Sequence, residues 1–469
     1  MNIIETMGHE HVFGPAFKDS ASWLAWRAYL STLFGTSHSK VSAEIARACT
    51  HQKTFLESGY RESWLVVGRR GGKSRILALI AVYVACFHHW ARHLAPGEVA
   101  TVMVIAADRK QARTIMRYAQ GLLNEVLPLK KLVRSCTQET IELTNRVVIE
   151  VHTASFRAVR GYTIAAALLD EVAFWRTDDA ANPDFEILSA LRPALSSLPD
   201  SMLIAASSPY ARRGALFDAY KQHFGNDASP VLVWQADTRK MNPGIDETII
   251  AQAYERDPES AQAEYGAQFR SDVSAFIPRN VIEAAIENEC FERPADSARK
   301  YVAFVDPSGG SQDSFTLAIG HGDRSRVVLD VIREAKPPFS PDNVVREFAA
   351  LLKAFGLRRV TGDRYAGEWP RERFRAHGIQ YVPSEQTKSD LYRDFLPLLM
   401  TSRVDLLDNK RLTAQLANLE RRVSRSGKDS IDHTPGTHDD VANAAAGALV
   451  LAVRPHAQTP QNIQLRLYA

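Results

Sequence analysis

The segment from Trp64 to Phe87 limits the possible folds more than any other part of the sequence. It runs from a short apolar stretch, Trp64–Val67, through Gly68-Arg-Arg-Gly-Gly-Lys-Ser74, into an almost wholly apolar stretch, Ile76–Phe87. A strand, a glycine-rich turn and a helix in this order let backbone N–H groups surround an anion at the positive end of the helix. The segment therefore predicts a phosphate-binding loop.

Lys73 and Ser74 supply the side chains that such a loop needs, because the lysine reaches the β- and γ-phosphates and the hydroxyl holds Mg²⁺. The spacing departs from GxxxxGK[ST], since Val67 occupies the place of the first glycine. A plain glycine-rich turn before a helix is the alternative. The loop predicts binding of ATP and Mg²⁺, with two arginines as further candidates to contact the γ-phosphate. The predicted nucleotide-binding residues are Gly68, Arg69, Arg70, Gly71, Gly72, Lys73 and Ser74.

Short apolar segments alternate with helical ones around this loop, which indicates a parallel sheet covered on both faces. The chain is expected to be an α/β protein with an N-terminal P-loop domain of the RecA type. The predicted strands are Trp64–Val67, Thr101–Ala106, Val147–Val151, Ala165–Leu169 and Met202–Ser207.

Two carboxylates, Asp170 and Glu171, directly follow the predicted strand Ala165–Leu169. At this position the first carboxylate holds the Mg²⁺ water shell and the second polarises the attacking water. A solvated strand end is the alternative, but the phosphate loop upstream favours a catalytic pair. Arg157 and Arg160 precede the strand, and either is a candidate arginine finger or an ordinary surface arginine.

Ser207 and Ser208 end the next strand, where a small hydroxyl could sense the γ-phosphate and relay it to a moving segment. An ordinary exit from a strand is the alternative interpretation. Together, these features predict an ATPase motor core.

A second set of carboxylates stands at element ends in the C-terminal part of the chain. Asp306 follows strand Tyr301–Val305, Asp363 follows strand Arg359–Gly362, and Asp440 stands immediately before the last apolar helix, Val441–Val453. Three such groups at one sheet edge can hold two Mg²⁺ or Mn²⁺ ions about 4 Å apart, which cleave phosphodiesters. A turn and a helix cap are the alternatives for the individual residues.

Further residues near this predicted metal site are accessory candidates. Asp439 is the alternative ligand to Asp440, Asp313 is an additional candidate ligand, and His438 is a flanking or phosphate contact. A basic stretch is predicted either to contact the DNA backbone or to form a solvated turn. Its residues are Arg421, Arg422, Arg425 and Lys428.

Composition and charge restrict the class of protein. The chain has 469 residues, with 57 basic against 54 acidic side chains, so it is not a strongly basic DNA-coating protein. The four cysteines lie far apart without a CxxC pair, which indicates reduced, mostly buried thiols rather than a zinc site. No secretory signal is recognisable, and the longest apolar run is too short to span a bilayer. We expect a cytoplasmic protein that does not enter a membrane.

Changes in pattern along the chain predict its domain organisation. Strands and helices alternate up to the irregular, polar stretch that begins near Tyr210, and a second β-rich unit opens at Tyr301. The expected parts are a helical lead-in (1–60), a P-loop domain (61–270) with a lid-like subdomain at about 210–270, a linker (271–298), a mixed-sheet domain (299–455) and a tail (456–469).

The ordered motifs resemble those of the large terminase subunit of tailed bacteriophages. The resemblance rests on GRRGGKS, RGYTIAAALLDE, ASSP, and the set VDPSGG, TGD and THDDVANA, and it covers roughly residues 50–455. It implies an RNase H-like nuclease domain, a catalytic Glu171, a trans-acting Arg160 and a nuclease triad of Asp306, Asp363 and Asp440. It also implies an adenine-contacting segment just before the P-loop, for which Gln52 is one candidate.

What the resemblance implies about function is a DNA-packaging motor in the bacterial host cytoplasm. Its partners would be double-stranded DNA, the portal protein of the prohead and a small terminase subunit. The chain would act as a ring on the portal, expected to be a pentamer in this family, and would be a weakly active monomer in isolation. Two alternatives stay open: a helicase–nuclease of repair or restriction, and a nucleotide-binding assembly protein without catalysis.

Overall fold

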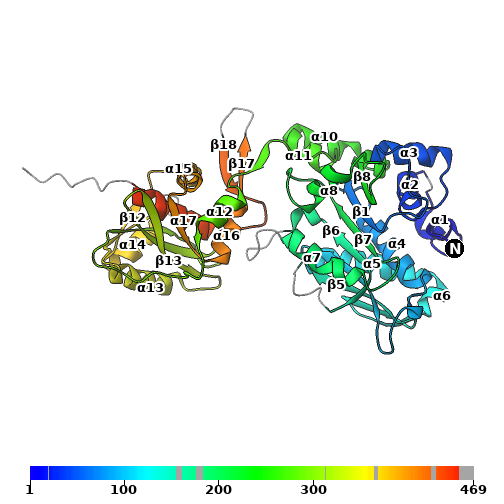
Figure 1. Ribbon diagram of the computed structural model, residues 1–469, viewed down its shortest axis with the longest axis horizontal. Helices are drawn as coiled ribbons and strands as arrows, with labels where there is room; N and C mark the ends of the chain where they lie inside the picture. The colour runs from blue at the N-terminus through cyan, green and yellow to red at the C-terminus, as the bar shows by residue number, and fades with distance from the viewer. Residues whose placement is uncertain are drawn as a thin grey trace, which may run out of the picture. The chain divides into compact units, whose positions relative to one another are not determined.

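The computed structural model describes residues 1–19, 21–154, 161–175, 183–311, 313–363, 368–423 and 429–453. These residues form two compact units, of which the first ends at Val273 and the second begins at Ser274 (Figure 1). Each unit has its own sheet and its own apolar core. Two separate folding cores are what a chain of this length is expected to form.

The sheet of the N-terminal unit has the strand order β3-β4-β5-β2-β6-β7-β1-β8. All neighbours from β5 to β8 are parallel, whereas β3 and β4 are antiparallel. The predicted α/β class is thereby confirmed, and β7 separates the strand of the phosphate loop, β1, from β6. The strands are β1 (Glu62–Val67), β2 (Ala100–Ala106), β3 (Val133–Cys136), β4 (Thr140–Leu143), β5 (Val147–Thr153), β6 (Thr163–Asp170), β7 (Met202–Ser207) and β8 (Val231–Ala236).

Helices cover both faces of this sheet, which explains why its central strands are apolar without alternation. In β1, Leu65 and Val67 join the core beneath α4 and α5, whereas Trp64 and Val66 join the core beneath α7 and α8. The helices are α1 (Ile3–Gly8), α2 (Leu24–Leu33), α3 (Lys40–Thr50), α4 (Lys73–Phe87), α5 (Arg109–Glu125), α6 (Leu127–Lys130), α7 (Pro183–Leu195), α8 (Ala215–His223), α9 (Thr238–Met241), α10 (Glu247–Arg256) and α11 (Pro258–Glu264).

The lead-in at 1–60, expected to be separate from the P-loop domain, and the lid-like segment, expected to be a subdomain of it, are both built into the N-terminal unit. Helices of the 1–60 lead-in share the main core, where Trp26 and Tyr29 are fully buried. The lid-like segment at 210–270 contains β8, which pairs with β1 along its whole length. Both segments therefore help to hold the phosphate loop.

The C-terminal unit contains a mixed sheet with the order β10-β16-β13-β12-β11-β14-β15 (Figure 1). Strands β11, β12 and β13 form an antiparallel meander, and β14 and β15 add to β11 in parallel. This 3-2-1-4-5 arrangement is the strand order of the predicted RNase H-like domain. The strands are β10 (Ile286–Glu287), β11 (Tyr301–Asp306), β12 (Phe315–Asp323), β13 (Arg326–Ala335), β14 (Arg359–Gly362), β15 (Gln380–Pro383) and β16 (Val404–Leu407).

The last helix, α17 (Asp440–Val453), lies directly against β11 and β12. Its contact with the sheet is close, because a Cβ on Gly447 would lie only 2.4 Å from the ring of Phe304. Small residues in α17 thus allow the helix to approach the sheet. The other helices of the unit are α12 (Arg279–Ala285), α13 (Pro341–Ala354), α14 (Trp369–Ala376), α15 (Lys388–Met400) and α16 (Lys410–Ala417).

The segment 271–298, expected to be a linker, contributes elements to the C-terminal unit. Strand β9 (Val273–Ala275) joins a three-stranded sheet with β17 (Leu419–Val423) and β18 (Asp429–His433), and β10 pairs with β16. The sequence did not predict these strands for two reasons. The segment 271–298 is polar, and β9 and β10 have only three and two residues. The expected tail at 456–469 lies outside the described residues.

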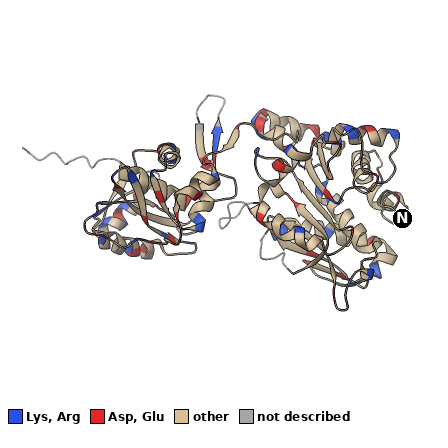
Figure 2. Cartoon of the chain, viewed as in Figure 1, with Lys and Arg blue, Asp and Glu red and all other residues tan. Residues whose placement is uncertain are grey.

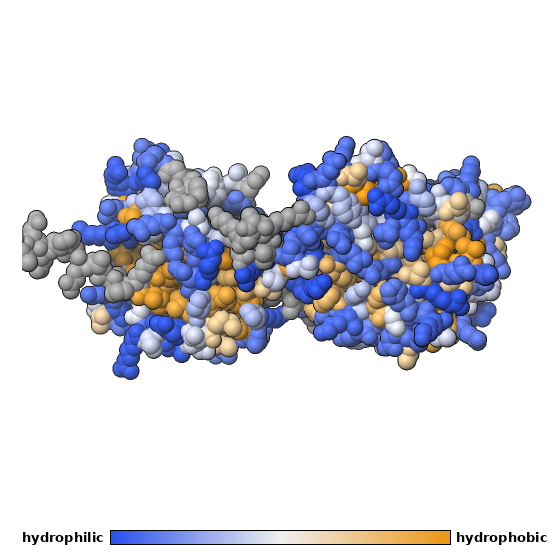
Figure 3. All heavy atoms as spheres, turned by 90° about the horizontal axis from the view of Figure 1, so that it is seen from above, coloured by the Kyte–Doolittle hydropathy of each residue, from blue (hydrophilic) through white to orange (hydrophobic). Residues whose placement is uncertain are grey.

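The surface of both units carries charged residues of both signs (Figure 2). Figure 2 shows basic and acidic residues interspersed over both units, and the face in Figure 3 is mainly hydrophilic with small apolar patches. The four cysteines are free, as expected, but only Cys49 is buried. Cys86 and Cys290 are partly exposed and Cys136 is exposed, so the expectation of mostly buried thiols is wrong. Among the described residues, no helix has both the length and the apolar character needed to cross a bilayer.

Candidate active sites

The phosphate loop, residues 68–72, leaves β1 and enters α4, as the sequence predicts. A Cβ on Gly68 would lie 2.3 Å from Thr238 Oγ1 and 2.6 Å from the Tyr265 carbonyl, so no larger residue fits there. Gly72 has a φ of 95°, which favours glycine. Glycine is therefore required at position 68, because the loop passes close to Thr238 and Tyr265 in the segment that follows β8.

Side chains from outside the loop bind its carbonyl groups. Thr238 Oγ1 donates to Arg69 O at 2.8 Å, Asn242 Nδ2 to Arg70 O at 2.9 Å and Trp26 Nε1 to Gly71 O at 2.8 Å. The first N–H groups of α4 have no acceptor within the helix. Together these contacts hold the loop in a form suited to an anion.

Lys73 lies where the loop, β6 and β7 come together. Its Nζ donates to Val67 O at 3.0 Å and to Ser208 Oγ at 2.9 Å, and it lies 3.3 Å from Glu171 Oε1. Its side chain is only 5% exposed, so the ammonium is held close to where phosphate would bind. Because β7 is the strand between β1 and β6, the lysine is within reach of both the loop and the carboxylates.

Asp170 and Glu171 end β6 and differ in their environments. Asp170 is 4% exposed, and its Oδ1 has no hydrogen-bond partner among the described residues. Burial, together with the neighbouring Glu171 carboxylate, raises the pKa of Asp170 to about 7. A buried acceptor without a partner beside a phosphate loop is the environment in which a hydrated Mg²⁺ fits.

Glu171 adopts a left-handed backbone conformation with a φ of 53°. Its Oε2 accepts hydrogen bonds of 3.1 Å from Ser207 Oγ and from the Ser208 backbone N–H. Strain of this kind in a non-glycine residue persists where the surroundings impose it, and it is common at active sites. The predicted coupling serines thus contact the predicted catalytic glutamate directly.

Of the two arginines in the loop, only Arg70 lies where it could contact a bound phosphate. Arg70 lines the cavity over the loop, whereas the guanidinium of Arg69 pairs with Glu264 at 3.0 Å. Arg157 and Arg160 lie outside the described residues. Gln52 is 2% exposed and donates to Asn226 O at 2.8 Å, and it does not line the cavity.

In the C-terminal unit, parallel pairing brings two predicted ligands to the same sheet edge. Val305 of β11 pairs with Gly362 of β14. Asp306 directly follows Val305, and Asp363 directly follows Gly362. The carboxyl ends of adjacent parallel strands form the usual binding edge of such sheets. The strand register therefore places these two carboxylates side by side.

The start of α17 brings the third aspartate to this edge. Asp440 Oδ2 accepts from the Ser314 N–H at 3.2 Å, and Thr316 Oγ1 donates to the Asp440 carbonyl at 2.8 Å. One turn later, Asn443 Nδ2 donates to Asp306 Oδ2 at 2.8 Å. The sequence analysis missed Asn443, although its position three residues after Asp440 was a usable signal.

Burial and the close approach of several carboxylates set the electrostatics of this three-aspartate site. Burial, with the nearby carboxylates of Asp440, Asp439 and Asp363, raises the pKa of Asp306 well above its usual value. Burial and the charge of Asp439 raise the pKa of Asp440 to about 6. Asn443 Oδ1, beside Asp306, is buried without a partner among the described residues. Hard oxygen ligands with raised pKa values fit a divalent cation, which would neutralise them.

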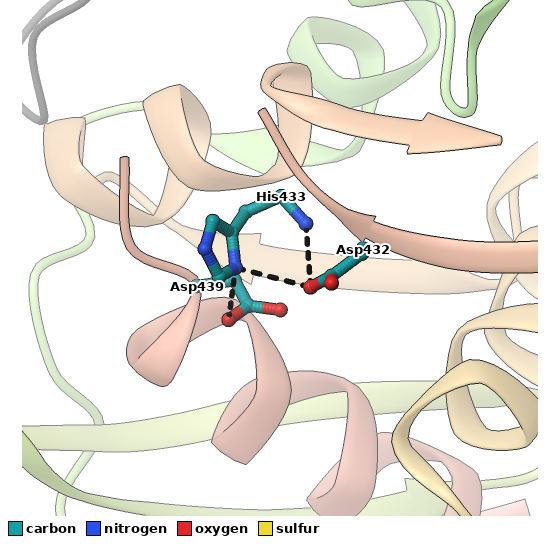
Figure 4. Close-up of side chains that lie close together, drawn as sticks. All are labelled: Asp432, His433 and Asp439. Atoms are coloured by element: carbon teal, nitrogen blue, oxygen red, sulfur yellow. Dashed lines mark hydrogen bonds and ion pairs between the residues drawn. The ribbon is translucent and has the colours of Figure 1, made fainter. Parts of the chain in front are cut away.

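Asp439 points into a different cluster, which Figure 4 shows with Asp432 and His433. His433 Nδ1 lies 3.1 Å from both Asp432 Oδ1 and Asp439 Oδ1. Lys388 Nζ lies 2.8 Å from Asp432 and 3.1 Å from Asp439, and the Tyr392 hydroxyl donates to Asp439 at 2.9 Å. The cations of Lys388 and His433 already neutralise the carboxylates of Asp432 and Asp439. This network is therefore better suited to hold the start of α17 in place than to bind a metal ion.

The charges in this network predict how stability depends on pH. Hydrogen bonds to Asp432 and Asp439 raise the pKa of His433 to about 9. A raised pKa means that the stabilisation is complete below about pH 6.5, the unfolded value, and is lost as the pH rises through 9. We expect the free energy of unfolding to fall by about 1–2 kcal/mol between pH 7 and pH 10, after allowance for partial exposure.

Urea unfolding of the full-length chain at pH 7 and pH 10 measures this change. His433→Gln should remove most of the decline, whereas His377→Gln, at the end of α14, should retain it. An equal decline in the wild type and in His433→Gln would mean that other groups cause it.

Those of the remaining predicted residues that the structure describes are exposed or partly exposed. Asp313 is exposed and pairs with His438 at 3.3 Å. In the basic stretch, Arg421 is exposed on β17, and Arg422 donates to Glu420 at 3.3 Å and to His433 O at 3.2 Å. Arg425 and Lys428 lie outside the described residues.

Comparison with known proteins gave structural matches alone, since no family model and no curated protein matches the chain. It is similar to the HK97 bacteriophage large terminase, with 20% identity, a TM-score of 0.37 and coverage of 83% of this chain and 91% of that one. It is similar to the large terminase of a thermophilic bacteriophage in complex with ADP, with 11% identity, a TM-score of 0.37 and coverage of 88% and 98%. The large terminase nuclease of thermophilic phage G20c with bound magnesium matches 36% of this chain and 94% of its own, with 19% identity and a TM-score of 0.32. Because these TM-scores are low, the fold assignment rests on the strand order of the two sheets.

Proposed function

We propose that this chain is a large terminase subunit, which uses ATP to move double-stranded DNA into a phage prohead and cuts concatemeric DNA with a metal-dependent nuclease. The observation that carries the proposal is the pairing of two sites in one chain. The Lys73–Glu171 pair lies at a phosphate loop on a parallel sheet, and Asp306, Asp363 and Asp440 gather at the edge of an RNase H-like sheet.

In the ATPase site, Lys73 and Ser74 would hold the β- and γ-phosphates, and Asp170 would hold the hydrated Mg²⁺. Glu171 is the group that would orient and polarise water, because its carboxylate is fixed by Lys73, Ser207 and Ser208. Ser208 also contacts Lys73, so a change at the γ-phosphate would reach β7 through this serine. Arg160 is the proposed trans-acting arginine of a neighbouring subunit.

In the nuclease site, Asp306, Asp363 and Asp440 are the proposed ligands of Mg²⁺ or Mn²⁺. The ions would supply Lewis acidity and an activated water for phosphodiester cleavage. Asp440 is favoured over Asp439 because Lys388, His433 and Tyr392 already engage the Asp439 carboxylate. The basic residues of β17 would contact the DNA backbone.

The proposed partners are double-stranded DNA, the portal protein and a small terminase subunit, and the proposed location is the cytoplasm of the bacterial host. The chain would act as a homo-oligomeric ring on the portal. A helicase–nuclease is less well supported, because the second sheet of the described residues has the RNase H-like order rather than that of another P-loop domain.

The test of this function is protection of DNA from external nuclease. The full-length chain, the small subunit, ATP and empty proheads that carry the matching portal are mixed with linear duplex DNA. We expect protected DNA only when both ATP and proheads are present. Strand separation of the duplex without any protection would instead support the helicase–nuclease.

A further inference from the structure

The cavity over the phosphate loop extends beyond the groups that would hold phosphate. Its volume is about 410 Å³, and it is lined by the loop, Glu171, Trp23, Tyr118 and Asn242, among others. Triphosphate alone would leave room for a larger group. The contacts of the lining residues indicate where that group would lie.

The two ends of the cavity differ in chemistry. Lys73 contacts Glu171 and Ser208, so this end suits the γ-phosphate and the water that attacks it. The N–H groups of Lys73 and Ser74 at the start of α4 continue the anion site, and it ends before Arg75, whose N–H donates to Gly72 O at 3.2 Å. The nucleoside end of a bound nucleotide would therefore lie on the Arg75 side.

Trp23 stands on that side. The guanidinium of Arg75 lies 5.0 Å from the centre of the Trp23 ring, and Phe17 meets the ring edge-on at 4.9 Å. A Cβ on Gly72 would lie 3.7 Å from the ring, so the indole is in contact distance of the loop. Trp23 is half-buried and lines the cavity, whereas Trp26 is fully buried and its indole N–H is bound to Gly71 O.

We propose that the nucleobase of the bound nucleotide packs against Trp23, which Arg75 and Phe17 hold in place. The base-binding residue thus comes from the N-terminal lead-in and not from the segment just before the loop, where Gln52 is buried against Asn226. The inference rests on the proposed binding of ATP at this loop. Stacking on an aromatic ring tolerates different bases, so Trp23 contributes affinity more than choice of base.

The experiment separates the base from the phosphates. Calorimetry of the full-length chain measures the Kd of Mg-ATPγS and of tripolyphosphate, which has no base. We expect Trp23→Ala to weaken ATPγS by about 10- to 100-fold and to leave tripolyphosphate unchanged. Trp23→Phe should restore most of the affinity, and Trp369→Ala in the C-terminal unit should have the wild-type Kd for both.

Each other result overturns the inference in a recognisable way. Unchanged ATPγS affinity in Trp23→Ala would show that the base lies elsewhere. Equal loss of both ligands would show that Trp23 only supports the loop, and tripolyphosphate binding also reports whether the variant is folded. A wild-type chain that binds neither ligand would refute the proposed ATP site itself.

Discussion

Asp306→Asn is expected to reduce metal-dependent cleavage of plasmid DNA about a thousandfold or more and to leave ATP hydrolysis unchanged. Asp306 ends the central strand of the C-terminal sheet, accepts a hydrogen bond from Asn443, and lies beside Asp363 in the strand register. An amide removes one negative ligand from the site and keeps the size of the side chain. The loss should therefore come from metal binding and not from unfolding.

Plasmid cleavage by the full-length chain with Mg²⁺ or Mn²⁺ measures this effect, and EDTA should abolish the wild-type activity. Asp323→Asn is the matched control, because Asp323 is exposed at the far end of the adjacent strand, β12. If Asp306→Asn still cuts at the wild-type rate, the three-aspartate site is not the nuclease. The proposed nuclease function would then be wrong, and the proposed ATPase site would remain to be tested by itself.

Lys73→Met is expected to lower the rate of ATP hydrolysis by about 10²–10³. The substitution removes the ammonium that contacts Glu171, Ser208 and the loop carbonyls, but it retains most of the apolar stem. Loss of this charge removes both the proposed phosphate ligand and the cation that contacts Glu171. DNA cleavage in the C-terminal unit should be unaffected.

A phosphate-release assay with saturating ATP measures the rate, and Lys131→Met, an exposed lysine after α6, is the matched control. Comparable rates in Lys73→Met and in the wild type would contradict the assignment of this loop. A simultaneous loss of DNA cleavage would mean that the substitution damages the whole chain. The two substitutions, Asp306→Asn and Lys73→Met, thus test the two sites independently.

The parts of the fold that the sequence predicts well are those with a strong local pattern. Strands β1, β2, β6 and β7 are continuous apolar runs that end in chemically distinctive residues, and the structure has each of them near its predicted bounds. Short or polar elements could not be predicted in this way. Strands β9 and β10 have three and two residues, and their place depends on partners more than a hundred residues away.

The same division holds at the candidate sites. Lys73, Asp170 and Asp306 could be found because glycines or apolar strands mark their positions. Lys388 and His433 could not, since each is an ordinary polar residue until the fold brings it to Asp439. Trp23 lies about 45 residues before the loop, and no motif marks it in the sequence.

The path by which the chain passes between its two units has a mechanical consequence. The crossing is made at β9, which is part of the sheet with β17 and β18, and the Phe276 N–H donates to Leu419 O at 2.9 Å. Tension on the backbone at this point would load the hydrogen bonds of β9 to β17 first. From β18 the load would pass through His433 to Asp439 and the start of α17. A pull exerted by the proposed ATPase would thus be felt at Asp439, one residue before the proposed metal ligand Asp440.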